Sequence, residues 1–407
     1  MSQSASKTSR AFSGILPCIM KYDFLSPNQI TFGWGRRTEL GKLCAALGER
    51  VFLISGSRSL ERLGLIDEIE KAISATGLKI HRFEAASHEP EVTDVDQLVG
   101  EFLKRQPTDK DVVVAIGGGS AIDLAKAAAT LVRNRHGSSV VDFLEGVGRG
   151  LQITERPLSV IAVPTTSGTG TEVTKNAVIS SYSPPFKKSL RSDLMIPRSV
   201  LVDPELTVSL PREITAYTGM DAITQLIESY LSRRAAPIPQ ALSLSALKTA
   251  LPALSAVVQD GTSRNGREVM SHAALLSGIA LANSGLGLAH GVAAALGVHC
   301  RVPHGLACAV MLPTALRVNQ QVREYEIAQL EQLFDQRHST TAASAAAFID
   351  RIENLCHEIG IPSQLRSIGV EINQLPALVQ SSRGNSMSGN PRDIDDAELL
   401  SILQQRW

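Results

Sequence analysis

Apolar and polar residues alternate in blocks along the first half of the chain. Short runs rich in Val, Ile and Leu are each followed by a stretch in which apolar residues recur at helical spacing. This pattern predicts strands at 51–54, 78–83, 111–116 and 158–163, and helices at 65–75, 95–104 and 122–132. Because apolar runs that alternate with helices are typical of a parallel sheet covered on both faces, we expect an α/β fold here.

The pattern changes after about residue 205, where long segments with helical spacing replace the strand-like runs. Helices are predicted at 215–231, 240–259, 267–284 and 341–359, with Ser209 as a helix cap and Pro211 in the first turn. Residues 383–396 predict a loop before a last helix. We therefore predict a flexible extension (1–20), an α/β domain (21–205) and an all-α domain (206–407).

Composition narrows the possible partners. The 407 residues include 40 Lys and Arg and 40 Asp and Glu, and this balance indicates no nucleic-acid partner. No apolar run reaches the ~20 residues that span a bilayer, so we expect no membrane association. The five cysteines are scattered without CxxC spacing, which is typical of free thiols in a reducing compartment. We expect a cytoplasmic protein.

A glycine-rich turn follows the predicted strand at 111–116. Gly117, Gly118, Gly119 and Ser120 lie between this strand and the next predicted helix. Glycines let a phosphate approach the backbone, and the free N–H groups at a helix start attract its charge. The spacing is not GxGxxG, so for this motif alone a plain tight turn is an equal alternative. Its place after a buried parallel strand favours phosphate binding.

A second polar turn follows the next predicted strand. Residues 164–172 carry Thr165, Thr166 and Thr169 together with two glycines. Ligands of open α/β sheets bind at the carboxyl ends of the strands. Two such turns in consecutive units therefore favour a ligand site over a solvated loop.

Four polar residues of the second half could hold a metal ion. Asp221 and Gln225 are four residues apart on a predicted helix, so they share a face. His290 heads an Ala-rich helical run, and His304 lies further along the chain. One carboxylate and two imidazoles suit Zn²⁺ or Fe²⁺, and such an ion can polarise a carbonyl or an alcohol oxygen. From spacing alone, histidines buried in a core remain the more common explanation.

Six motifs together resemble the iron-containing (group III) alcohol dehydrogenase family, in the family's order. They are GGGSAIDLAKA (117–127), PTTSGTGTEVTKNAV (164–178), LVDPELTVSLP (201–211), TGMDAITQLIESYLS (218–232), GLAHGVAAALG (287–297) and PHGLACAVMLP (303–313). The resemblance covers about residues 25–405. It implies the dehydroquinate synthase-like fold, with a nicotinamide dinucleotide in the first domain, metal and substrate in the second, and a homodimer.

The resemblance also implies roles for individual residues. The cofactor residues would be Gly118, Gly119 and Ser120 at the diphosphate, Thr165, Thr166 and Thr169 along the dinucleotide, and Lys187 at the ribose. The metal-binding and catalytic residues would be Asp221, His290 and His304.

The chain departs from the family pattern at the metal. Gln225 stands where the family usually has a histidine ligand, and its amide oxygen would be a weak fourth ligand or give way to water. Ala294 stands where many members carry a histidine that is thought to relay protons. Gln225, His299 or water could take over that relay.

A third departure concerns the cofactor. Ser57, followed by Arg58, stands where members that prefer NAD often carry an aspartate. Without that carboxylate a 2′-phosphate is not repelled, and Arg58 could bind it. We therefore expect NADP(H) to be accepted or preferred, with an Arg58 that merely faces solvent as the alternative.

These features predict a metal-dependent, NAD(P)-linked alcohol dehydrogenase or aldehyde reductase with a small alcohol or aldehyde as substrate. Gln225 and Ala294 favour one alternative, a metal-free reductase of the maleylacetate reductase type. A catalytically silent nucleotide-binding or assembly subunit is a second, although the retained metal-site residues argue against it. A lyase of the dehydroquinate synthase type is a third, and the lack of a dense Lys and Arg set disfavours it.

Overall fold

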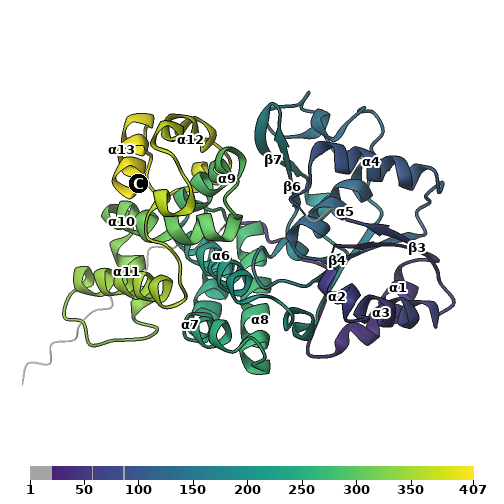
Figure 1. The fold of residues 1–407 in the computed structure, drawn as a ribbon, viewed down its shortest axis with the longest axis horizontal. Helices are drawn as coiled ribbons and strands as arrows, with labels where there is room; N and C mark the ends of the chain where they lie inside the picture. Colours follow the sequence, from purple (N-terminus) through teal and green to yellow (C-terminus); the bar gives the residue numbers. More distant parts are fainter. Residues whose placement is uncertain (1–20, 57, 86–87) are drawn as a thin grey trace, which may run out of the picture.

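Six parallel strands form the sheet of the first half in the computed structural model, which describes residues 21–407 except 57 and 86–87 (Figure 1). Their order across the sheet is β1-β8-β5-β4-β2-β3. Their bounds are β1 Gln29–Phe32, β2 Arg50–Ser55, β3 Lys79–Glu84, β4 Asp111–Gly117, β5 Ser159–Pro164 and β8 Ser199–Val202. The central strands β4 and β5 are almost wholly buried, which explains their continuous apolar sequences.

Helices cover both faces of this sheet. The helices of this half are α1 Leu40–Leu47, α2 Arg58–Arg62, α3 Leu65–Ser74, α4 Val92–Leu103 and α5 Gly119–Leu131. Along β2, Val51 and Leu53 pack with α1 and α3, whereas Phe52 and Ile54 pack with α4 and α5. This alternation follows from the two-residue period of a strand. The predicted α/β fold is confirmed, and the predicted extension at 1–20 lies outside the described residues.

Several elements of this half were not predicted, among them helices α1 and α2. Strands β1 and β8 have four residues each, too few to show a clear pattern. An antiparallel hairpin, β6 (Asn176–Tyr182) and β7 (Pro185–Arg191), extends from the sheet toward α9 (Leu288–Cys300) (Figure 1). The polar residues of β7 hid its strand character. This hairpin is important because it carries Lys187 toward the helical half.

Helices alone build the second half in the described part of the chain. They are α6 Arg212–Leu231, α7 Pro237–Gln259, α8 Arg264–Ala282, α9 Leu288–Cys300, α10 His304–Glu331, α11 Thr341–Glu358, α12 Leu375–Ser381 and α13 Asp396–Arg406. Helix α6 is the central one, because residues 219–231 are all buried. A helix that is buried all round must satisfy its polar side chains internally. The predicted all-α second half is confirmed.

The start of α6 differs from the prediction. Pro211 is the N-cap residue and no side chain caps the helix, whereas the Ser209 hydroxyl lies 3.4 Å from that of Ser59. The prediction of Ser209 as a cap was therefore wrong. The last strand of the sheet ends at Val202 and α6 begins at Arg212. The predicted domain limits of 21–205 and 206–407 remain a prediction.

Helix α7 is long and apolar enough to cross a membrane by composition alone, and no other described helix is. It nevertheless packs against α6 and α8. Its residues Leu247, Leu251 and Leu254 belong to the same core cluster as the apolar residues of α6. We therefore assign α7 to the core of the helical half.

Replacing Phe102 by alanine tests the packing of α4 on the sheet. Phe102 is fully buried, and its ring centroid lies 4.7 Å from that of Phe52 and 5.0 Å from that of Phe83. The variant should lose about 3–5 kcal/mol of unfolding free energy in urea titrations, because a large cavity replaces the ring. Leu63→Ala is the control, since Leu63 is 60% exposed. Equal stability of both variants would contradict this packing.

Candidate active site between the sheet and the helical half

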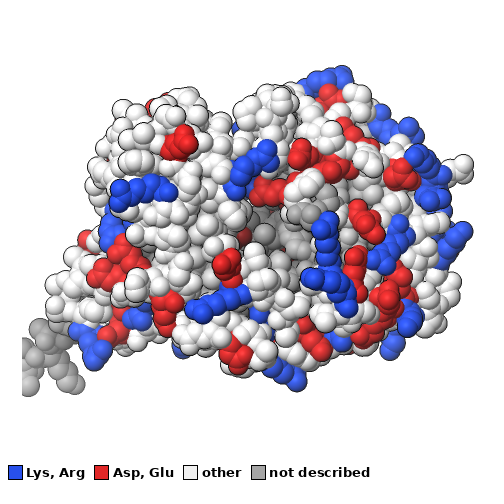
Figure 2. Space-filling model, in the orientation of Figure 1, with Lys and Arg blue, Asp and Glu red and all other residues white. Residues whose placement is uncertain are grey.

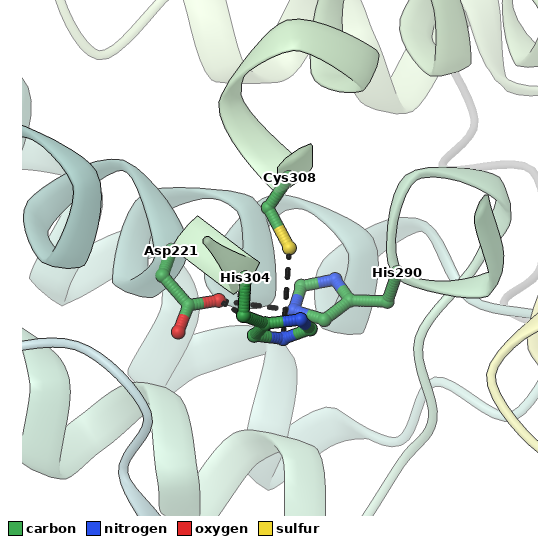
Figure 3. A group of neighbouring side chains, drawn as sticks. All are labelled: Asp221, His290, His304 and Cys308. Atoms are coloured by element: carbon green, nitrogen blue, oxygen red, sulfur yellow. Dashed lines mark hydrogen bonds and ion pairs between the residues drawn. The ribbon is translucent and has the colours of Figure 1, made fainter. Parts of the chain in front are cut away.

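Four side chains from three helices converge near the sheet (Figure 3). Asp221 comes from the buried α6, His290 from the first turn of α9, and His304 and Cys308 from the first turns of α10. One potential ligand atom of each lies within 4.8 Å of the others. His290 Nε2 is 3.2 Å and His304 Nε2 is 3.8 Å from Asp221 Oδ1. The structure thus brings the three predicted metal-binding residues together and adds Cys308.

A second carboxylate orients His290. Glu228 lies two turns after Asp221 on α6 and accepts a hydrogen bond from His290 Nδ1 at 2.7 Å. It also accepts the backbone N–H groups of Ala289 and His290, at 2.7 and 3.3 Å. These N–H groups belong to the first turn of α9 and have no partner within the helix. Glu228 therefore caps α9 and aims His290 Nε2 at Asp221, as carboxylates do behind metal-binding histidines.

Burial and charge set the protonation of the cluster. Burial opposes the charge of Asp221, but His304 and His290 hold the pKa of that carboxyl below its usual value. Burial also opposes a charge on His290, yet Cys308, Asp221 and Glu228 raise its pKa well above the usual value.

The other two members are neutral without an ion. Burial, together with the charge of Lys187, lowers the pKa of His304 to about 4. Burial raises the pKa of the Cys308 thiol to about 12. The metal-free cluster thus contains a carboxylate, a neutral imidazole with a free lone pair, a protonated imidazole and a thiol, and a divalent cation fits this donor set because it would replace the protons.

Gln225 links the cluster to the sheet. Its amide oxygen accepts a hydrogen bond from Ser277 at 2.8 Å, and its amide nitrogen donates to the Thr169 carbonyl at 3.2 Å. The amide nitrogen also lies 3.4 Å from Asp221 Oδ1. The structure therefore turns the oxygen of Gln225 away from the cluster, and its role as a fourth ligand remains only a prediction.

The glycine turn lies at the start of α5, and the second polar turn packs against it. Gly118, Gly119 and Ser120 are half-buried, and Gly118 is the N-cap residue of α5. A Cβ at Gly119 would lie only 2.8 Å from Thr169 Oγ1, and a Cβ at Gly118 would lie 3.3 Å from Thr166 Cγ2. The glycines therefore allow the two turns to touch. The N–H groups at the start of α5 have no partner within the helix.

A buried lysine holds the second turn in place. Lys126 of α5 is 1% exposed and donates to the carbonyl of Thr171 at 2.9 Å and to the Thr174 hydroxyl at 3.0 Å. Thr165, by contrast, is 4% exposed, and its backbone N–H donates to the Gly117 carbonyl. Of the three predicted threonines, Thr166 and Thr169 are therefore the accessible ones.

The remaining predicted residues lie in different places. Lys187 of β7 forms an ion pair with Glu89 at 2.5 Å, and its charge acts on His304. Arg58 is exposed at the start of α2, and Ser57 lies outside the described residues. The ring of His299 forms a 2.7 Å hydrogen bond with the Ser381 hydroxyl. His299 lies about 13 Å from His290 along α9, because a helix rises 1.5 Å per residue. Figure 2 shows a hollow between the two halves, with charges of both signs on its rim.

Sequence reasoning missed Cys308 and Glu228. Cys308 is four residues after His304, and Glu228 is seven residues after Asp221, so each pair shares a helical face. That spacing could have identified both residues as neighbours of the predicted ligands.

A second group in the described part of the chain, Glu331, Asp335 and His338, is also compatible with a metal. Arg351 already binds the Glu331 carboxylate through two nitrogens, at 2.9 and 2.6 Å, so we give this group no role.

A parallel sheet with a glycine turn, next to a buried carboxylate and two imidazoles, is compatible with a metal-assisted, dinucleotide-dependent oxidoreductase. Comparison with known proteins gives the family. The model named iron-containing alcohol dehydrogenase matches residues 27–204, and the model of the C-terminal part of the same family matches residues 215–407. The chain belongs to the iron-containing alcohol dehydrogenase family.

The sequences and structures of individual relatives match this chain over nearly its whole length. The 1,3-propanediol dehydrogenase of Klebsiella pneumoniae is 30% identical over 95% of this chain and 99% of its own length. The NAD-dependent methanol dehydrogenase of Bacillus methanolicus is 30% identical over 94% and 99%. The crystal structure of a 1,3-propanediol oxidoreductase matches with a TM-score of 0.88 and 29% identity, covering 95% of this chain and 100% of that one. The chain is thus an NAD(P)-linked alcohol dehydrogenase or aldehyde reductase of a metal-binding family.

Metal binding should release protons. A cation displaces the proton of His290, whose pKa is raised, so Zn²⁺ binding near pH 7 should release at least about one proton and should strengthen as the pH rises. Titration calorimetry in two buffers of different ionisation enthalpy measures this number. Binding enthalpies that do not depend on the buffer would contradict the protonation described above.

Proposed function

We propose that the cluster is the catalytic metal site and that the cofactor lies across the glycine turn. The observation that carries this proposal is the chain of contacts from one to the other. Gly119 touches Thr169, the carbonyl of Thr169 accepts from Gln225, and Gln225 lies beside Asp221. A dinucleotide at the start of α5 would therefore end near the cluster.

In this proposal Asp221, His290 and His304 hold a divalent cation such as Fe²⁺ or Zn²⁺. When bound, the cation polarises the substrate oxygen, and the nicotinamide gives or takes the hydride. Glu228 keeps His290 Nε2 directed at Asp221 and so fixes the ligand geometry before the substrate arrives. The proton of the alcohol leaves through water or the ribose hydroxyls, because Ala294 offers no relay.

We assign the cofactor-binding residues from their positions at the start of α5, in the second polar turn and on β7. The N–H groups of Gly119 and Ser120, at the positive end of α5, bind the diphosphate. Thr166 and Thr169 line the same turn, and Thr165 supports it from below through its bond to Gly117. Lys187 would exchange its partner Glu89 for the cofactor ribose.

We further propose a small alcohol or aldehyde as substrate, a homodimer and a cytoplasmic location. Relatives named for 1,3-propanediol and methanol support small substrates. The free cysteines Cys44, Cys300, Cys308 and Cys356 support a reducing compartment. A metal-free reductase is the second candidate, because the oxygen of Gln225 is turned away from the cluster. Elemental analysis of the purified protein distinguishes the two.

Replacing His290 by alanine tests the metal role. The variant should lose bound metal and lose more than about 100-fold in kcat/KM for aldehyde reduction, since a direct ligand matters at least as much as an outer-shell partner. His357→Ala is the control, because it removes an exposed imidazole in the last turn of α11. Full activity of His290→Ala, or of wild-type protein after chelation, would exclude a catalytic metal.

Replacing Arg58 by alanine tests the choice of cofactor. If Arg58 binds the 2′-phosphate, the variant should bind NADPH about tenfold more weakly, as expected for a lost charge-assisted bond at an exposed site, and NADH unchanged. Arg62→Ala, at the other end of α2, is the matched control. Kinetics with an aldehyde panel and both cofactors give the constants. An equal effect on both cofactors would refute phosphate binding by Arg58.

A further inference from the structure

The thiol of Cys308 points toward the other three side chains of the cluster (Figure 3). It is fully buried, one helical turn after His304, and its Sγ lies 3.7 Å from His304 Nε2. Its sulfur also lies within 4.8 Å of the potential ligand atoms of His290 and Asp221. A buried free cysteine commonly acts as a small apolar residue. Cys308 differs because its sulfur lies within 4.8 Å of polar atoms of three other side chains.

Three of the six distances between the four ligand atoms are close to the edges of a tetrahedral site. With a Zn–S distance of about 2.3 Å and Zn–N and Zn–O distances of about 2.0–2.2 Å, a tetrahedron has edges of about 3.3–3.7 Å. The three measured edges are 3.2 Å (His290 to Asp221), 3.8 Å (His304 to Asp221) and 3.7 Å (Cys308 to His304). The remaining edges are no longer than 4.8 Å. Small side-chain shifts therefore suffice to place all four atoms around one ion.

Gln225 does not compete for this fourth position. Its oxygen is held by Ser277, and its nitrogen, which cannot bind a metal, is the atom that faces Asp221. Turning the amide around would break the bonds to Ser277 and to the Thr169 carbonyl. Cys308, by contrast, has no hydrogen-bond partner outside the cluster to give up among the described contacts.

We propose that Cys308, as a thiolate, is the fourth ligand of a metal site formed with Asp221, His290 and His304, and that this site selects Zn²⁺ over harder ions such as Mn²⁺. The inference rests on the proposed metal role of the other three residues. On binding, the S–H bond breaks, the S–metal bond forms and the proton passes to solvent. Thiolate softness is the source of the selectivity. A substrate oxygen would be a fifth donor, which zinc sites accept.

Cobalt spectroscopy tests the proposal on the whole protein. Metal-stripped protein is loaded with one equivalent of Co²⁺, which reports its own ligands. The wild-type protein should show a sulfur-to-cobalt charge-transfer band in the near ultraviolet together with intense visible bands of tetrahedral cobalt. Cys308→Ser should lose the ultraviolet band but keep bound cobalt. Cys356→Ala, which removes another buried thiol, should keep both.

Affinity gives an independent readout. Cys308→Ser should weaken Zn²⁺ binding by at least about tenfold, as loss of a direct ligand must at least match loss of an outer-shell partner, and Mn²⁺ binding much less. A reciprocal variant with the four other cysteines, Cys18, Cys44, Cys300 and Cys356, replaced by serine leaves the site intact and should keep the band. This variant decides the matter even if Cys308→Ser does not fold.

The outcomes separate the two proposals. Stoichiometric cobalt without a charge-transfer band in the wild-type protein, or a band that survives in Cys308→Ser, overturns the role of Cys308 and leaves the three-residue metal site intact. Failure of the wild-type protein to bind cobalt or zinc at all overturns the metal site itself, and the role of Cys308 with it.

Discussion

The position of His290 between two buried carboxylates is the constraint on which the site depends. Glu228 and Asp221 lie on a part of α6 that is buried on every side, and each contacts one nitrogen of the same imidazole. A buried carboxylate without a partner costs several kcal/mol, so His290 offsets part of the cost of placing both carboxylates on α6. The pairing also fixes the start of α9 on α6. Since α10 begins four residues after α9 ends, His304 and Cys308 then arrive beside Asp221.

The connection to the sheet follows a similar logic. Gln225 occupies the turn of α6 between Asp221 and Glu228, and its amide reaches the Thr169 carbonyl of the second polar turn. That turn is held from the other side by Lys126, and it can approach α5 only because Gly119 has no side chain. The proposed dinucleotide site and the proposed metal site are therefore connected through the amide of Gln225.

The sequence predicted the architecture where the signal was long, and failed where it was short. The runs at 111–116 and 158–163 became β4 and β5, because a strand buried on both faces is apolar throughout. Strands β1 and β8 were too short, and the hairpin β6–β7 is polar on its second strand. At the site, Asp221, His290 and His304 were predicted as a group and lie together. Glu228 and Cys308 escaped because helical spacing identifies a shared face, but only the packing of α6, α9 and α10 shows where that face points.

Charge balance gives a further reason why a thiolate belongs in this cluster. Asp221 is the one charged residue among the three proposed ligands, since His290 and His304 bind metal as neutral rings, and the second nearby carboxylate, Glu228, lies behind His290 rather than at the ion. A thiolate at Cys308 brings the sum of the ion and its ligands to zero, which lowers the cost of placing the ion away from water. Asp221 and Cys308 together would therefore supply the two negative charges that balance the divalent ion. The amide of Gln225 adds no charge, and its oxygen and nitrogen are already hydrogen-bonded. It therefore suits a role as the connection between the cofactor turn and the metal site better than a role as a ligand.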